Sequence, residues 1–424
     1  MLSLGVAVLV LGHQLWLWAR GWRFNALSPY FLCDLVIFAL FGLGPSAAPL
    51  PHRSPTEEWL LSIYIWGGLI AYYIGLHFPF RFPKLRWVNP VRFSGGLRGR
   101  GRVLTFAIAG CLVFLAVSIA YQRLLTVGIS LTELASIKLV RLHGQLEGAA
   151  ALPVVLVQLL MVWLSVHLYL LLQRRRLGEA IAVYVLMVFS IVIIAVTRIP
   201  IITTLAVPLA YYHYAVRRIN WVLVAAIVLG APISLTLLHG LRGGGLFAWS
   251  VSDRMVAEAQ VLHSFYHLWE KYIEGALPLE YGANYYYYSL LALIPKALWQ
   301  AKPLTSFEAR WTENLFGSLV DAAGQINVHT FTPLGEGLVQ FGWLGGALNL
   351  FLYGIIVNAS IRFFRSRPHA CLVYFYYAVA SATFIRTSVQ ALAFTTALYV
   401  VGVWLYERWL MPKQFREVKE CASS

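Results

Sequence analysis

The chain has 424 residues, of which 59% are hydrophobic and only 12% are charged. Soluble globular proteins carry about 25% charged residues, so this composition excludes an ordinary soluble domain and indicates an integral membrane protein. The net charge of +15 would suit a nucleic-acid-binding protein, but the positions of the basic residues favour a signal of membrane topology instead. The four cysteines lie in three apolar segments and the C-terminal tail, which gives no disulfide framework.

Apolar segments of about 20 residues, the length that crosses the hydrocarbon core of a bilayer, recur along the chain. They predict an all-α polytopic membrane protein with about eleven transmembrane helices. The first segment has no basic n-region and no small-residue cleavage site, so we interpret it as a retained span and not as a signal peptide. The predicted spans are 2–19, 27–44, 59–78, 103–121, 152–172, 179–197, 199–215, 220–238, 336–357, 370–385 and 388–406.

The connections between these spans alternate in charge. One set, with Glu179 at its edge counted in, holds 21 of the 33 Lys and Arg residues against four acidic residues, whereas the other set holds 12 basic and 13 acidic residues. Loops rich in Lys and Arg stay on the cytoplasmic side of a membrane, so we expect a cytoplasmic C-terminus and an external N-terminus. A polyanion-binding patch in the 79–102 loop is the alternative interpretation. The basic set comprises 20–26, 79–102, 173–178, 216–219, 361–369 and the tail from 407.

Two of the expected external segments are long, 122–151 and 239–335. The second contains an apolar stretch, 283–299, in which Pro295 and nearby lysines argue against a full span. We expect this stretch to form an interfacial or re-entrant helix on the outer leaflet. The chain thus divides into spans 1 to 8 (1–238), a large external loop (239–335), and spans 9 to 11 with a cytoplasmic tail (336–424). Any chemistry is expected to involve this loop.

Three arginines depart from the charge rule, because they lie at the expected outer ends of spans. They are Arg198, Arg242 and Arg386. A charge at membrane depth is costly unless it is paired or faces a polar cavity, and the planar guanidinium suits bidentate contacts with phosphate. We therefore expect a pyrophosphate-binding pocket built from these residues, helped by Lys302 or Arg310 from the loop. The alternative is that each side chain extends to lipid headgroups.

Two residues near the end of the loop are candidate general bases. Glu336 is expected to open span 9, and His329 precedes it by seven residues. A carboxylate there would remove the proton of an attacking hydroxyl, or it would only cap the first amides of its own helix. A histidine titrates near neutral pH and is the competing base. Sugar-stacking faces are expected from Tyr286, Tyr287 and Trp299, with anchoring at the membrane interface as the alternative.

Several motifs are absent from the sequence. It has no Walker P-loop, no Asp-x-Asp pair, and no set of His, Cys, Asp or Glu with metal-ligand spacing. We therefore expect neither a metal nor another cofactor. Within the spans Asp34 is the main ionisable residue, with His13 and His167 as weaker candidates, which is few for a proton-coupled transporter.

The segment from 294 to 345 resembles the O-antigen polymerase (Wzy-type) family, the oligosaccharide repeat-unit polymerases. The family pattern Ile-Pro-Arg-x-x-Trp-Pro-x-Lys-Pro stands here as Ile294–Pro303, with Lys296 in place of Arg and Gln300 in place of the second Pro. The following Thr-Pro, Gly-Glu and Phe-Gly-x-x-Gly elements are Thr332-Pro333, Gly335-Glu336 and Phe341–Gly345. The Arg198 junction also resembles the family, and the spacing from Glu336 to the two glycines is similar to that of the related O-antigen ligases.

This resemblance implies a GT-C-like fold in the bacterial inner membrane, with a periplasmic N-terminus and active site. It implies a glycosyltransferase that polymerises undecaprenyl-diphosphate-linked oligosaccharide into a cell-surface polysaccharide. The implied partners are this lipid-linked substrate, membrane lipids, a repeat-unit flippase and a chain-length regulator, with no nucleic acid. An O-antigen ligase acting on lipid A core, a polysaccharide flippase or transporter, and a non-catalytic scaffold remain as alternatives.

Overall fold

The computed structural model describes residues 2–20, 25, 27–47, 54–79, 107–115, 117–118, 151–194, 198–216, 251–292, 299, 303–317 and 329–410. Within these ranges all regular secondary structure is helical. Five of the described helices are long and apolar enough to cross a membrane: Leu2–Ala19, Pro55–Leu76, Val155–Gln173, Thr332–Arg365 and Val389–Trp409. These helices indicate a membrane protein, as the composition predicts.

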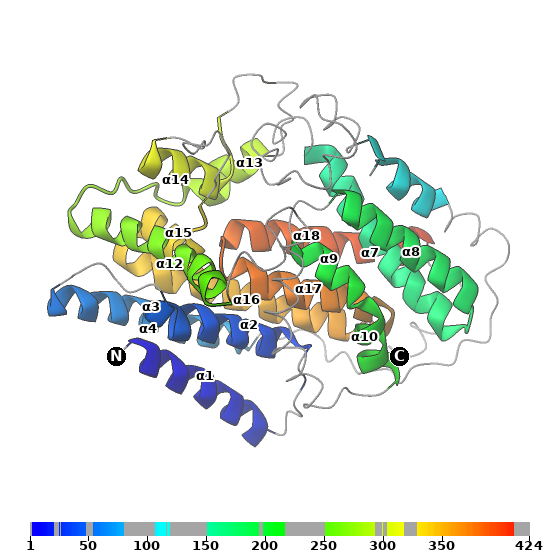
Figure 1. Cartoon of the computed structure of the whole chain (residues 1–424), viewed down its shortest axis with the longest axis horizontal. Coiled ribbons are helices and arrows are strands. Elements are labelled where there is room, and N and C mark those ends of the chain that lie inside the picture. The colour runs from blue at the N-terminus through cyan, green and yellow to red at the C-terminus, as the bar shows by residue number, and fades with distance from the viewer. Residues whose placement is uncertain are drawn as a thin grey trace.

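The first half of the chain contributes α1 (Leu2–Ala19), α2 (Pro29–Ile37), η1 (Phe38–Leu43), α3 (Gly44–Ala47), α4 (Pro55–Leu76), α7 (Ala151–Gln173), α8 (Leu177–Ile194), α9 (Arg198–Leu205), α10 (Val207–Tyr211) and η3 (Tyr212–Val216). The second half contributes α12 (Val251–Ile273), η5 (Asn284–Tyr288), α13 (Ser289–Ala292), α14 (Phe307–Phe316), α15 (Thr332–Phe341), η7 (Gly342–Leu344), α16 (Gly345–Arg365), η8 (Pro368–Ala370), α17 (Cys371–Phe384), α18 (Val389–Leu405) and η9 (Tyr406–Leu410). In Figure 1, α16, α17 and α18 run through the centre of the bundle, α4 lies at the left, and α7 and α8 lie at the right.

Most of the predicted spans coincide with helices of the structure, including α1, α4, α7, α17 and α18. The span predicted at 220–238 lies outside the described residues, and of 103–121 only 107–115 and 117–118 are described. The count of eleven spans and the GT-C-like architecture therefore stay predictions.

The segment predicted as span 9 lies within a longer helical segment than expected. The helical segment begins at Thr332, not at Glu336, and it is interrupted after Phe341. Gly342 has a φ of +63°, a conformation that L side chains rarely adopt, and the chain turns there before α16 begins. The turn brings the two helices so close that a Cβ on Gly345 would lie 3.1 Å from the Cα of Gly337.

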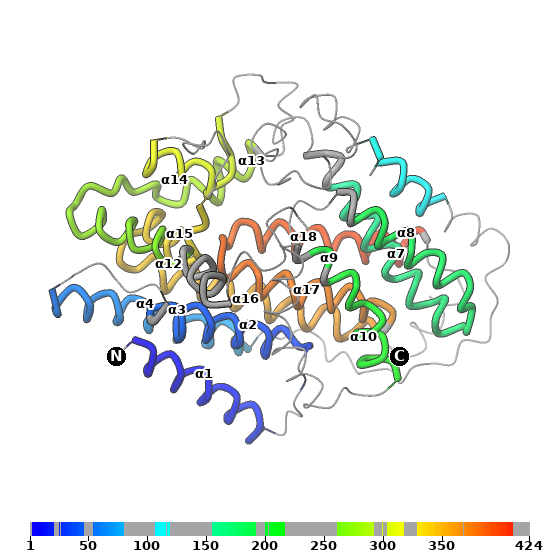
Figure 2. Tube along the Cα trace, viewed as in Figure 1, coloured from blue at the N-terminus to red at the C-terminus, as the bar shows by residue number. Residues whose placement is uncertain are grey.

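The segment expected to be a large loop is an ordered helical layer where the structure describes it. α12 has 23 residues and packs against α15 and α3. Its buried residues Leu262, Phe265 and Trp269 recur at helical spacing on one face, which is the pattern of an amphipathic helix. In Figures 1 and 2 the helices α12, α14 and α15 gather on the left, the side on which α1 begins.

The central contact of the bundle is the parallel pair α4 and α16, whose backbones touch at glycines. A Cβ on Gly75 would lie 3.0 Å from the carbonyl carbon of Phe351, and one on Gly354 would lie 2.6 Å from the backbone nitrogen of Leu76. Small residues allow such close approach of membrane helices, where dispersion contacts replace the hydrophobic effect as the driving force.

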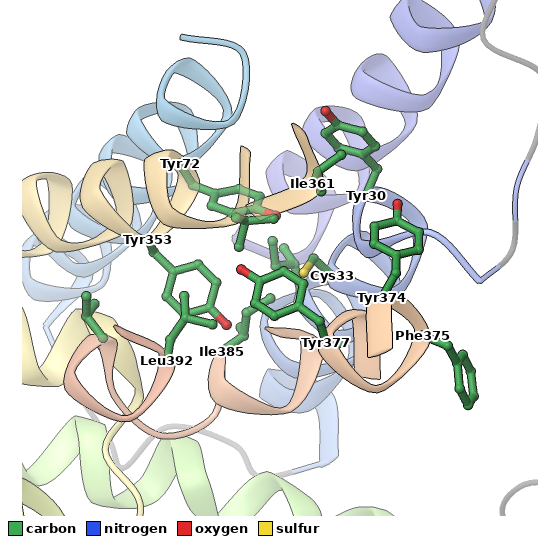
Figure 3. Packing of buried hydrophobic residues seen from close by; sticks show 14 of the residues in the cluster. Tyr30, Cys33, Tyr72, Tyr353, Ile361, Tyr374, Phe375, Tyr377, Ile385 and Leu392 are labelled. Atoms are coloured by element: carbon green, nitrogen blue, oxygen red, sulfur yellow. The ribbon is translucent and has the colours of Figure 1, made fainter. Parts of the chain in front are cut away.

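Buried aromatic side chains fill the space beside this pair. Figure 3 shows Tyr72, Tyr353 and Tyr377 gathered with Cys33, so that α2, α4, α16 and α17 all contribute to one cluster. The hydroxyl of Tyr353 donates to the carbonyl oxygen of Ser381, which satisfies a polar group that would otherwise be unpaired in the core.

We expect Gly354→Ala to lower the stability of the protein by about 1–3 kcal/mol, because the added methyl group meets backbone atoms of α4 that cannot move aside. Thermal unfolding in detergent measures the effect. Gly67→Ala on α4 is the matched control, since a Cβ there meets nothing within 4 Å. Equal melting temperatures for the two variants would contradict the close helix contact.

Candidate functional site

Glu336 is a completely buried carboxylate within α15. It lies in the second turn of the helix, so the expectation that it caps the first amides of its own helix is wrong. The residue that opens α15, Thr332, has a φ of +63°, which is rare for a residue other than glycine. Its hydroxyl accepts a bond from the backbone N–H of Gly335 at 3.4 Å, so the first turn is held by its own side chain.

The two oxygens of Glu336 accept hydrogen bonds from three other segments. The side-chain amide of Asn284, at the start of η5, donates to Oε1. The backbone N–H of Val389, the first residue of α18, donates to Oε2 at 2.6 Å. A longer contact of 3.5 Å joins the same oxygen to Nδ2 of Asn349 in α16. Glu336 thus binds the N-terminal, electropositive end of a helix that follows it by 53 residues.

Arg310 extends this network toward the surface. One of its terminal nitrogens donates to Oδ1 of Asn284 at 3.1 Å, which fixes the amide so that its nitrogen points at Glu336. Its guanidinium binds both oxygens of Glu280, with the longer bond at 3.3 Å. Its Cζ also lies 3.4 Å from the ring centre of Tyr288. Only 8% of the residue is exposed, so its charge is neutralised within the site.

Glu280 is held by two further donors. Trp311 donates through Nε1 at 3.1 Å, and Gln340, one turn after Glu336, donates through Nε2 at 2.6 Å. Gln340 also accepts the backbone N–H of Asn284 at 3.2 Å. The network therefore links the carboxyl groups of Glu336 and Glu280 with the guanidinium of Arg310, and all three are hydrogen-bonded within the site.

Tyr285 is a further member of the hydrogen-bond network around Glu336. Its hydroxyl donates to Oδ1 of Asn349, whose amide nitrogen in turn donates to the carbonyl oxygen of Pro333 at 3.1 Å. Burial, with the charge of Glu336 as a smaller cause, raises the pKa of Tyr285 well above its usual value. The phenol is therefore a neutral donor at physiological pH.

His329 occupies a separate environment. Its Nδ1 lies 3.1 Å from the hydroxyl of Ser264 on α12, and its ring stacks on Phe316 with centroids 4.3 Å apart. Its backbone N–H donates to the hydroxyl of Thr312 on α14 at 2.8 Å. Partial burial, followed by the charges of His263 and His267, lowers its pKa. The half-buried imidazole is therefore neutral near pH 7.

The predicted phosphate-binding residues are only partly described. Arg386 lies in the turn between α17 and α18, three residues before Val389, whose amide binds Glu336. The backbone of Arg198 opens α9, but its side chain is outside the described part of the chain. Arg242 and Lys302 also lie outside it. The structure thus brings the Arg386 turn and Glu336 to one helix terminus.

The tyrosine side chains that follow Asn284 point in two directions, toward the surface or into the network. Tyr286 and Tyr287 are 61% and 48% exposed, and Trp299 is 38% exposed, so all three can meet a ligand or the membrane interface. Tyr285 and Tyr288 instead point into the network.

The sequence analysis missed Glu280, Asn284, Gln340 and Asn349. Asparagine and glutamine in strongly apolar segments are a usable signal, because a buried amide needs partners. Their pairing was not visible, since Asn284 and Glu336 are 52 residues apart. Among the residues that the structure describes, no group of three or more His, Cys, Asp or Glu side chains has the arrangement of a metal site.

No protein-family model matches the chain, and no curated protein or solved structure matches it either.

We expect Arg310→Met to destabilise the protein by about 3 kcal/mol, because it leaves the carboxylate of Glu280 without its cation in a nearly dry site. Thermal unfolding in detergent measures the loss. The double variant Arg310→Met with Glu280→Gln should recover part of it, since no unpaired charge remains. Arg176→Met is the control, because its partner Glu179 forms a more exposed pair with it. A loss no larger than that of the control would show that the Arg310 pair is not sealed from water.

Proposed function

We propose that the chain polymerises undecaprenyl-diphosphate-linked oligosaccharide repeat units into a cell-surface polysaccharide at the periplasmic face of the bacterial inner membrane. The observation that carries this proposal is the shared position of Arg386 and Glu336 at the N-terminal end of α18. Glu336 already accepts the first amide of α18, so Arg386 beside it is the cation that would meet a phosphate-bearing substrate there. The motifs around Ile294–Pro303 and Gly335-Glu336 support the same class.

The proposed reaction is a direct displacement at the anomeric carbon of a lipid-linked glycan. The hydroxyl oxygen at the non-reducing end of a second lipid-linked unit attacks that carbon. The bond from the carbon to the diphosphate oxygen breaks, and the lipid diphosphate leaves with the electron pair. Arg198, Arg242 and Arg386, with Lys302, stabilise the charge that grows on the departing diphosphate.

The hydroxyl proton passes to a base, for which we propose His329. Its imidazole is half-buried and neutral, whereas both oxygens of Glu336 are engaged by donors in the core. Glu336 and Arg310 act as positioning residues: they hold α15, η5 and the start of α18 in one arrangement. Tyr286, Tyr287 and Trp299 offer exposed faces for the acceptor sugars.

The substrate for a direct test is the lipid-linked repeat unit that accumulates in cells from which this gene is deleted. Purified protein in detergent should convert it into a ladder of longer glycans in the presence of EDTA and without lipid A core. Arg386→Ala should lower the rate by about 100-fold or more, because one stabilising cation is lost at the leaving group. Arg386→Lys should retain part of the activity, and Arg408→Ala at the opposite end of the bundle is the control.

Two results would contradict this proposal. Transfer only after lipid A core is added would identify a ligase instead. Full activity in folded Arg198→Ala, Arg242→Ala and Arg386→Ala variants would exclude the pyrophosphate pocket.

The acid limb of the pH–rate profile tests the base. His329 accepts a proton only when neutral, and its pKa is lowered, so the acid limb should lie below 6.5, the usual pKa of histidine. His329→Ala should lower the plateau rate by about 100-fold or more and abolish this limb. His263→Gln removes one charge that lowers the pKa of His329, so it should move the limb to higher pH with the plateau unchanged. An unchanged limb in both variants would assign the proton to another group.

A further inference from the structure

A groove lies between α1 and α4, at the edge of the bundle along which α1 runs in Figure 2. It has a volume of about 410 Å³ and is lined along most of its length by apolar side chains such as Val8, Ile70 and Ile74. Gly12 forms part of its wall, and a Cβ there would meet nothing within 4 Å. The groove is therefore open space of the shape and chemistry that a hydrocarbon chain fills.

One end of the groove is polar, where α1 and α4 both end. His13 and His77 face one another there, with their Nε2 atoms 2.8 Å apart. Behind them the buried carboxylate of Asp34 lies 2.6 Å from Nδ1 of His13 and accepts a bond from Tyr73 at 3.0 Å. Gln14 adds a third contact to Asp34 at 2.5 Å. The acid is thus satisfied within the protein.

This arrangement assigns the protons of the two rings. Asp34 accepts from Nδ1–H of His13, so Nε2 of His13 holds a lone pair and accepts from Nε2–H of His77. The remaining nitrogen of His77 is then the atom that can take up a proton. An anion placed beside the ring would favour that protonation.

Two arginines, one after α1 and one in α16, lie near this polar end. Arg20 follows α1, and its Cζ lies 4.3 Å from the ring centre of Trp16, which lines the groove. Arg362 of α16 lies 3.5 Å from the carbonyl oxygen of Phe78, the residue after His77. The charge at the end of the groove is therefore positive, whereas its walls are apolar.

We propose that this groove binds one anionic phospholipid, with an acyl chain along α1 and α4 and its phosphate at His77 and Arg20. Basic pockets between membrane helices recognise acidic headgroups in this way. The site lies at the opposite end of α4 and α16 from Glu336, so it is independent of the proposed polymerase chemistry.

The test is native mass spectrometry of the full chain, delipidated in mild detergent and titrated with phosphatidylglycerol or phosphatidylcholine. One phosphatidylglycerol should bind about tenfold more tightly than phosphatidylcholine. Arg20→Gln should weaken phosphatidylglycerol about fivefold and leave phosphatidylcholine unchanged. Gly12→Leu fills the groove and should weaken both lipids about tenfold. Gly67→Leu, also in open space but outside the groove, is the matched control and should bind as the wild type does.

Equal affinity for the two lipids, or wild-type binding by folded Gly12→Leu, would overturn the proposal. If Gly12→Leu fails to fold, the double variant His77→Gln with Arg20→Gln tests the proposal: unchanged selectivity for phosphatidylglycerol contradicts the site.

A competition experiment uses glycerol phosphate. Displacement of the lipid at equal concentration would show that the site takes a soluble phosphate and not a lipid, whereas no displacement supports the role of the acyl chain.

Discussion

A carboxylate that is sealed from water must find all its hydrogen-bond partners inside the protein, and Glu336 imposes this requirement on the helices around α15. Its partners come from η5 and α18, with a longer contact from α16. Each segment is therefore fixed relative to α15. Removing any one partner would leave this buried group partly unsatisfied. The geometry of the site therefore depends on the packing of these helices.

The position of Glu336 in the bundle depends on close contacts between α15, α16 and α4. Gly337 and Gly345 touch across the turn between α15 and α16, and Gly75 and Gly354 join α16 to α4. With no side chains between the backbones, these helices have little freedom to slide. The closely packed pair α4 and α16 thus fixes α15, and the carboxylate of Glu336 on α15 binds the first amide of α18.

In the described part of the chain, one hydrogen-bonded cluster of ionisable groups lies near each end of α4 and α16. At one end Glu280 neutralises Arg310, and Asn284 connects that pair to Glu336. At the other end Asp34 is held by neighbours that include His13. The two clusters differ in surroundings: the first is covered by the α12–α14 layer, whereas the second borders an apolar groove. We connect the first with glycosyl transfer and the second with lipid binding.

The sequence by itself determined the membrane class, most helix positions and the candidates Arg386, His329 and Glu336. These features are local, because an apolar length, a run of charges or a motif is contained in neighbouring residues. Tertiary structure decided that Glu336 caps α18, that Arg310 is paired with Glu280, and that the described part of the segment 239–335 folds as a helical layer. Those outcomes depend on partners more than 20 residues apart in the chain, and only the packing of distant helices selects such partners.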